Sequence, residues 1–161
     1  MKHAVLALSL AALAAGPAAA RDTAAGDLVV KDAVMRAVAP GVANTAGYLT
    51  IANKGSKPDK LLSAACDCAR SVEVHVSHVM NGMAMMMPAS AVTVPAGGQI
   101  SFSPGGYHLM VMGLKAPLTD GRTQDVVLKF ERAGTVKAAF DVRSRIALAA
   151  APAMAGMDMH R

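Results

Sequence analysis

The chain has 161 residues, with 16 Lys or Arg against 11 Asp or Glu and a formal net charge of +5. This length fits one domain with a single core. The basic clusters interleaved with aromatic residues that typify nucleic-acid-binding proteins are missing. Twelve methionines stand against three Phe and no Trp. Packing alone favours rigid branched or aromatic side chains, so methionine either replaces aromatics here or serves another purpose.

The first twenty residues have the pattern of a secretory signal peptide. A weakly basic start precedes the apolar run Ala4–Ala15, Gly16-Pro17 ends that run, and three alanines before Arg21 offer a cleavage site. The run is shorter than the roughly 20 residues that span a bilayer. The alternative is an uncleaved N-terminal anchor. We expect export, with residues 1–20 removed and no stable membrane insertion afterwards.

The following residues, after a polar lead-in, alternate short β-type runs with turn residues, as at Pro40-Gly41 and Asp120-Gly121. Many short strands at this spacing predict an all-β sandwich or barrel over residues 21–146. Residues 147–161 form a small-residue tail that we expect to be flexible. The predicted strands are Leu28–Val38, Thr45–Asn53, Lys60–Ala65, Ser71–Ser77, Val92–Val94, Gln99–Ser103, Tyr107–Met112, Gln124–Phe130 and Thr135–Arg143.

The candidate ligands lie on two of these strands. In a strand, alternate side chains point to opposite faces. His75 then points to one face of its strand, while the apolar Val72, Val74 and Val76 point to the other. On the second strand, His108 and Met110 point away from the face that carries Tyr107, Leu109 and Val111. This placement away from the predicted core faces argues against two satisfied core histidines.

His108 and Met110 are two residues apart on one strand, roughly 6.5 Å along the backbone. Long side chains at that spacing can converge on one ion. The turn residues Pro104-Gly105-Gly106 come just before, which places the pair near a loop end. Taken alone, however, His-x-Met is weak evidence, and an ordinary structural pair remains the alternative.

A second group of candidate ligands begins at His75. Residues 75–87 contain two histidines and five methionines, and Asn81-Gly82 predicts a hairpin turn between them. One interpretation is a methionine-lined surface for binding proteins. The histidines favour metal instead, and mixed imidazole and thioether ligands suit Cu(I) better than zinc, iron or calcium. This pattern does not identify which methionine binds.

The spacing of four residues resembles a known family. His75, ten residues, Met86, twenty-one residues, His108, one residue and Met110 match the H-x10-M-x21-H-x-M signature of the PCuAC family of periplasmic copper chaperones. The segments VPAGG at 94–98 and PGGYHLMVMGL at 104–114 are also similar to that family's surroundings. The resemblance covers roughly residues 27–143. It implies a cupredoxin-like Greek-key β-sandwich or barrel, with those four side chains binding Cu(I).

The resemblance further implies a periplasmic chaperone that passes copper toward cytochrome c oxidase, and we expect the protein to be a monomer. The acceptor would be an oxidase subunit or a Sco-type thiol protein. The same ligands would also serve a copper-sequestering resistance protein, and Cu(II) could bind through histidines and the tail. No catalytic motif such as G-x-S-x-G or H-E-x-x-H is present, so we expect no enzyme activity.

The sequence also offers auxiliary ligands that lie outside the signature. Cys66 and Cys68 could form a thiolate copper site or a redox pair, or could be two small structural side chains, and we expect no disulfide because a bridge across two residues closes a tight ring. The tail repeats Met/His chemistry and could capture copper. The full set of possible auxiliary ligands is His78, Met80, Met83, Cys66, Cys68, Met157, Met159 and His160.

Overall fold

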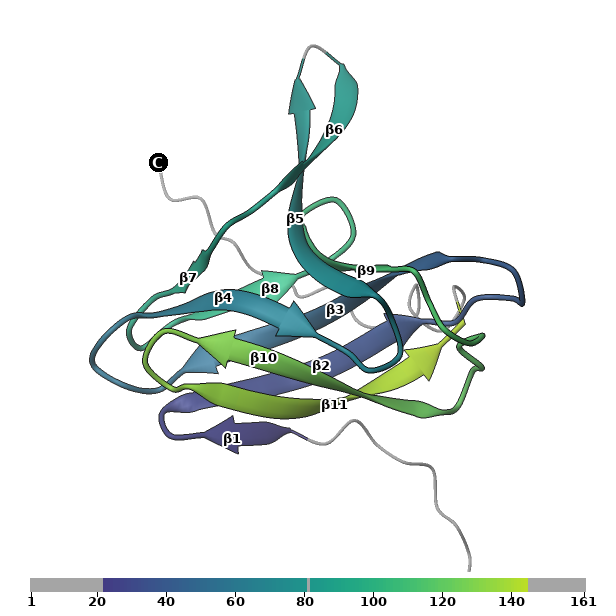
Figure 1. The fold of residues 1–161 in the computed structure, drawn as a ribbon. Coiled ribbons are helices and arrows are strands. Elements are labelled where there is room, and N and C mark those ends of the chain that lie inside the picture. The colour runs from purple at the N-terminus through teal and green to yellow at the C-terminus, as the bar shows by residue number, and fades with distance from the viewer. Residues whose placement is uncertain (1–21, 81, 145–161) are drawn as a thin grey trace, which may run out of the picture.

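The computed structural model describes residues 22–80 and 82–144, which fold entirely from strands and connecting loops (Figure 1). The predicted signal peptide and the predicted tail from residue 147 lie outside these residues. In the part of the chain that is described, no helix is long and apolar enough to cross a membrane. The prediction of an all-β fold is confirmed.

Eleven strands make up this part of the chain. They are β1 (Thr23–Ala25), β2 (Leu28–Arg36), β3 (Asn44–Asn53), β4 (Asp59–Ala65), β5 (Ser71–Met80), β6 (Met83–Pro88), β7 (Val92–Val94), β8 (Gln99–Phe102), β9 (Tyr107–Met112), β10 (Thr123–Phe130) and β11 (Thr135–Arg143). Neighbours follow the order β1-β2-β11-β10-β4-β5-β9-β3-β8, and a further β2–β3 pairing closes the sheet into a barrel. The β11–β2 pairing is parallel.

The barrel interior follows from the alternation of side chains along each strand. In β10, Val126, Leu128 and Phe130 are buried while their neighbours Val127 and Lys129 are exposed. The same alternation in the other strands fills one continuous core. Because a strand shows every second side chain to each face, the other face of each barrel strand can carry ligands.

All nine predicted strands are present, three with the predicted bounds and six with a shifted end. Strand β5 continues to Met80, three residues past its predicted end, and β2 stops at Arg36. The region expected to be a polar lead-in contains β1, because Thr23–Ala25 pairs with β2. Strand β6 was anticipated only as the second arm of a hairpin. Methionine has no strong strand preference, and it is pairing with β5 that makes Met83–Pro88 a strand.

Strands β5 and β6 form a hairpin that stands away from the barrel (Figure 1). The first part of β5 pairs with β9 on the barrel, from Ser71 to Val76. From His75 to Met80 its other edge pairs with β6, so His75 and Val76 have a partner strand on both sides. The same strand therefore belongs to the barrel at one end and to the projecting hairpin at the other.

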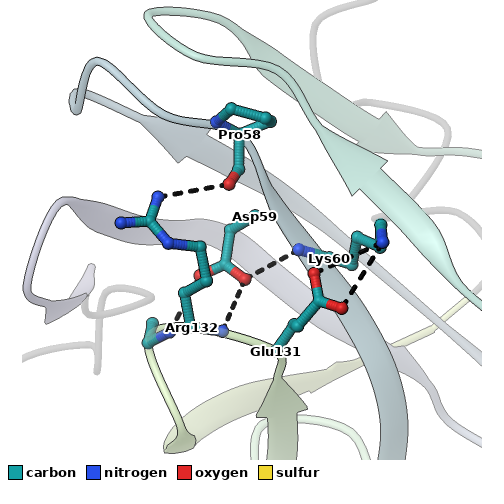
Figure 2. Close-up of polar contacts among 6 residues, drawn as sticks. Pro58, Asp59, Lys60, Glu131 and Arg132 are labelled. Atoms are coloured by element: carbon teal, nitrogen blue, oxygen red, sulfur yellow. Dashed lines mark hydrogen bonds and ion pairs between the residues drawn. The ribbon is translucent and has the colours of Figure 1, made fainter.

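A buried carboxylate fastens the β10–β11 turn to the start of β4 (Figure 2). Asp59 is only 4% exposed. Its carboxylate accepts hydrogen bonds from the backbone N–H groups of Lys60, Arg132 and Ala133, at 2.7, 2.9 and 2.9 Å. Burial raises the pKa of Asp59, but these three donors together outweigh it, so the pKa lies below its usual value. An exposed Lys60–Glu131 ion pair lies beside it.

Candidate metal centre

Two imidazoles face each other across neighbouring strands. His75 of β5 and His108 of β9 are directly opposed in the antiparallel register. Their ring centroids are 5.9 Å apart, with the ring planes inclined by 59°. The valines that alternate with His75, Val72 and Val74, are buried on the core side. The prediction that both histidines lie opposite the core faces agrees with this register.

His108 is held firmly, although it lies on the outer face of the barrel strands. His108 is only 6% exposed, because neighbouring segments cover it. Ring nitrogen Nδ1 donates a hydrogen bond to the Gly106 carbonyl oxygen at 3.1 Å, since a carbonyl can only accept. The same oxygen accepts the Ser77 N–H at 3.1 Å. Nδ1 therefore carries the proton in the neutral ring, and Nε2 keeps its lone pair for a metal.

His75 is oriented by a carboxylate that the sequence analysis did not assign to the site. Its Nε2 lies 3.0 Å from Oε2 of Glu73, whose side chain is half exposed. Glu73 is two residues away on β5 and so lies on the same face. A neutral ring that donates from Nε2 to this carboxylate offers Nδ1 as its metal-binding atom. The sequence feature that could have revealed this contact is the spacing of Glu73 and His75, since residues two apart on a strand share a face.

The two predicted methionine ligands lie on either side of the histidine pair. On β9, Met110 is opposite Glu73 and is partly buried. On β6, Met86 is opposite Ser77 and is 62% exposed. Because Glu73, His75 and Ser77 alternate along β5, Met110, His108 and Met86 all lie on the face that carries His75. The register thus brings the four predicted ligands to one face of β9, β5 and β6.

The predicted auxiliary ligands are arranged differently. His78 is opposite Met85, and Met80 is opposite Met83. These pairs alternate with the Ser77–Met86 pair, so they lie on the other face of the hairpin. The tail candidates Met157, Met159 and His160 lie outside the described residues.

The expectation that Cys66 and Cys68 do not form a disulfide is wrong. The structure joins them in a bridge, and the described chain contains no free cysteine. The turn after β4 brings their Cα atoms to 5.1 Å, which is within the range that a bridge requires. The Ala69 N–H donates to the Cys66 carbonyl and helps to close this turn. Bridged sulfurs are not thiolates, so this form of the pair cannot provide the thiolate copper site.

The donors suit one kind of ion. Two neutral imidazole nitrogens and two thioether sulfurs carry no charge, and thioethers favour soft ions such as Cu(I). Structural zinc sites normally use thiolates, imidazoles or carboxylates, and calcium takes oxygen ligands. Within the described residues, no group of three or more His, Cys, Asp or Glu side chains could hold a metal. A site here therefore depends on its methionines.

Comparison with known proteins supports a family assignment. A family model described as "Putative lipoprotein LpqE-like" matches residues 28–142. This chain belongs to the LpqE-like family. The "Putative lipoprotein Lxx21020" of Leifsonia xyli subsp. xyli (strain CTCB07) is 36% identical over 106 residues, which are 65% of this chain. The match spans 64% of the length of that relative.

Solved structures relate this LpqE-like chain to PCuAC domains. Apo-DR1885 from Deinococcus radiodurans is 35% identical, with a TM-score of 0.60 over 91% of this chain and 98% of that chain. A Cu(I) form of DR1885 also matches, at 36% identity and a TM-score of 0.57 over 82% of this chain and 85% of that chain. The apo PCuAC domain of PmoF1 is 27% identical, with a TM-score of 0.68 over 77% of this chain and 99% of that domain. The resemblance to the PCuAC family and the expected fold are confirmed.

Proposed function

We propose that this protein is an exported copper chaperone that binds Cu(I) through His75, Met86, His108 and Met110. The observation that carries the proposal is the facing His75–His108 pair with a methionine on either side, on one face of three adjacent strands. The match to DR1885, for which a Cu(I) form is known, supports copper as the cargo. Two of the four donors are thioether sulfurs, which supports Cu(I) rather than Cu(II) as the bound form.

The contrast in exposure among the ligands supports transfer more than permanent storage. His108 is buried and hydrogen-bonded to Gly106, whereas Met86 lies on the projecting hairpin. A partner can reach the ion from the Met86 side and replace that thioether with its own thiolate or imidazole. Copper then passes by shared coordination, with no free ion. Because neutral imidazoles are the ligands, binding weakens when they are protonated in acid.

Export of the chain is part of the proposal. The apolar leader before Arg21 supports it, and so do the lipoprotein names of the family and of the Leifsonia relative. The acceptor we propose is a copper-receiving protein of the same compartment, either a subunit of cytochrome c oxidase or a Sco-type thiol protein. Both would present the soft or imidazole ligands that exchange with this donor set.

Titration of the protein with Cu(I) against a competing Cu(I) chelator tests the site. We expect one tight equivalent, and we expect a Met86→Leu, Met110→Leu double variant to lose it. Leucine keeps the size of methionine and removes the sulfur. Unchanged tight binding in the double variant would reject the proposed ligands.

Disruption of the gene separates delivery from sequestration. If the protein delivers copper, oxidase activity falls when copper is limiting and recovers when copper is added. If the protein only sequesters copper, the disrupted strain is instead sensitive to high copper and has normal oxidase activity at low copper. That second result would overturn the chaperone role while leaving the copper site in place.

A further inference from the structure

The β5–β6 hairpin has two faces with different side chains. Counting outward from the barrel, the cross-strand pairs His75–Pro88 and Ser77–Met86 belong to the face of the proposed copper site. The alternating pairs belong to the opposite face, which we call the back face. Its pairs are Val76–Met87, His78–Met85 and Met80–Met83. Four of these six back-face residues are methionines and a fifth is a histidine.

These methionines are not packing a core. Met80, Met83, Met85 and Met87 are 44–65% exposed, and His78 is exposed as well. The hairpin that carries them stands away from the barrel (Figure 1), and none of them belongs to the hydrophobic core or to the side chains packed against it. Large apolar side chains gain nothing from this exposure. Their common chemical property is a thioether sulfur, and the histidine adds an imidazole.

The spacing allows these donors to meet. Side chains opposite each other on antiparallel strands have Cβ atoms about 4.5–5.5 Å apart, and diagonal neighbours are about 7–8 Å apart. His78–Met85 and Met80–Met83 are successive pairs on one face. Methionine is long, unbranched and flexible, so sulfurs from both strands can reach an ion lying above the two pairs. No carboxylate lies among the six back-face residues, so the set selects for a soft monovalent ion.

We infer that the back face of the hairpin is a second metal site, at which His78, Met80, Met83 and Met85 bind a soft monovalent cation such as Cu(I) or Ag(I). The site is distinct from the one proposed above, because the two sets of side chains point to opposite sides of the same two strands. All of its ligands lie on an exposed hairpin, and no described hydrogen bond fixes the His78 ring. It therefore binds more weakly and exchanges faster than the site around His108.

Titration of the full-length protein with Ag(I), followed through the methyl signals of methionine labelled with ¹³C at Cε, tests this inference. Silver(I) is diamagnetic and is not oxidised in air. We expect two successive equivalents. The first shifts the Met86 and Met110 methyl signals, and the second shifts those of Met80, Met83 and Met85. A second equivalent that shifts only the tail signals of Met157 and Met159, or no second equivalent, would overturn the inference.

Matched variants separate the two sites. A Met80→Leu, Met83→Leu, Met85→Leu variant should bind one equivalent fewer than the unmodified protein, with the tighter step unchanged. A Met86→Leu variant should weaken the tighter step and keep the second. A triple variant that retains both equivalents would overturn the back-face site. If Met86→Leu changes neither step while the triple variant loses one, the front site proposed above fails and the back-face site stands.

A protein-docking role for the back face gives a different result. A surface that binds only protein would show no shift of the Met80, Met83 and Met85 signals at any silver concentration, and this outcome would also overturn the metal site. Because the observation is made on the unmodified chain, it does not depend on whether the leucine variants fold.

Discussion

His108 on β9 and Met86 on β6 lie on the same face, on either side of β5, but the chain holds them very differently. His108 is 6% exposed and is hydrogen-bonded to the Gly106 carbonyl, which also accepts the Ser77 N–H. Met86 is 62% exposed on a hairpin that projects from the barrel. One half of the proposed site is thus preorganised, and the other half is open to a partner. A carrier needs both properties, because it must hold its ion and also release it.

The largest expected effect comes from removing the fixed half. Replacing an outer-shell partner of a metal ligand typically costs about 10–100-fold in affinity, so losing the ligand itself in His108→Ala should cost at least about 100-fold. Competition with a Cu(I) chelator measures this change. His78→Ala is the control, because His78 lies on the opposite face. A similar loss of the tight step in both variants would contradict the assignment of His108.

The barrel can be weakened without touching the site. Asp59→Asn removes a buried carboxylate that accepts three backbone hydrogen bonds. The NH2 group of the asparagine would point at a backbone N–H, so two donors would meet with no acceptor between them. We expect a loss of about 2 kcal/mol in the free energy of unfolding, measured by denaturant titration, with Cu(I) affinity of the folded protein unchanged. A change in affinity would mean that the two regions are coupled.

The same carboxylate predicts how stability depends on pH. The pKa of Asp59 is lower in the folded chain than its ordinary value. Its contribution is therefore complete above the unfolded pKa and is lost as the pH falls through the folded pKa. Asp59→Asn should flatten this acid limb of the stability curve. If the acid limb is unchanged in Asp59→Asn, the loss of stability at low pH comes from other carboxylates.

Removing Met86, the exposed ligand, should lower Cu(I) affinity less than removing His108 does, and should mainly speed the release of Cu(I). Met86→Leu keeps the apolar character of the hairpin and removes one thioether. We expect affinity to fall about 10-fold, equivalent to about 1.4 kcal/mol, with faster dissociation of Cu(I) in stopped-flow chelator exchange. Met87→Leu, one residue along and on the other face, should leave the exchange rate of the tight step unchanged. Equal effects of the two would contradict the division of the hairpin into two faces.

The smallest expected effect concerns Glu73, which positions His75. Glu73→Gln keeps the shape and hydrogen-bonding capacity of the side chain but removes its charge. Because Glu73 is half exposed, the loss of affinity should lie at or below the low end of the 10–100-fold range, at about 10-fold or less. Glu73→Ala should cost more, because it also removes the hydrogen-bond acceptor. Equal affinity in Gln, Ala and unmodified chains would show that the carboxylate does not orient the imidazole.

The sequence predicted most strands because alternation and turn residues are local properties. Thr135–Arg143 and Val92–Val94 were predicted with their observed bounds. The local signal fails where pairing with a distant segment decides the structure, as it does for β1, which is a strand because it lies along β2. It also fails at Cys66 and Cys68, where the backbone of the turn brings two close neighbours within bridging distance.

The sequence by itself determined the strand faces of three candidate ligands, His75, His108 and Met110, because side-chain alternation has a period of two and needs no partner. Only the tertiary structure decided that β5 pairs with β9 in the register that sets His75 opposite His108, and that β5 then leaves the barrel with β6. Register depends on long-range packing and hydrogen bonding. For the same reason, the burial of His108, the Glu73–His75 contact and the separate back face of the hairpin became evident only in three dimensions.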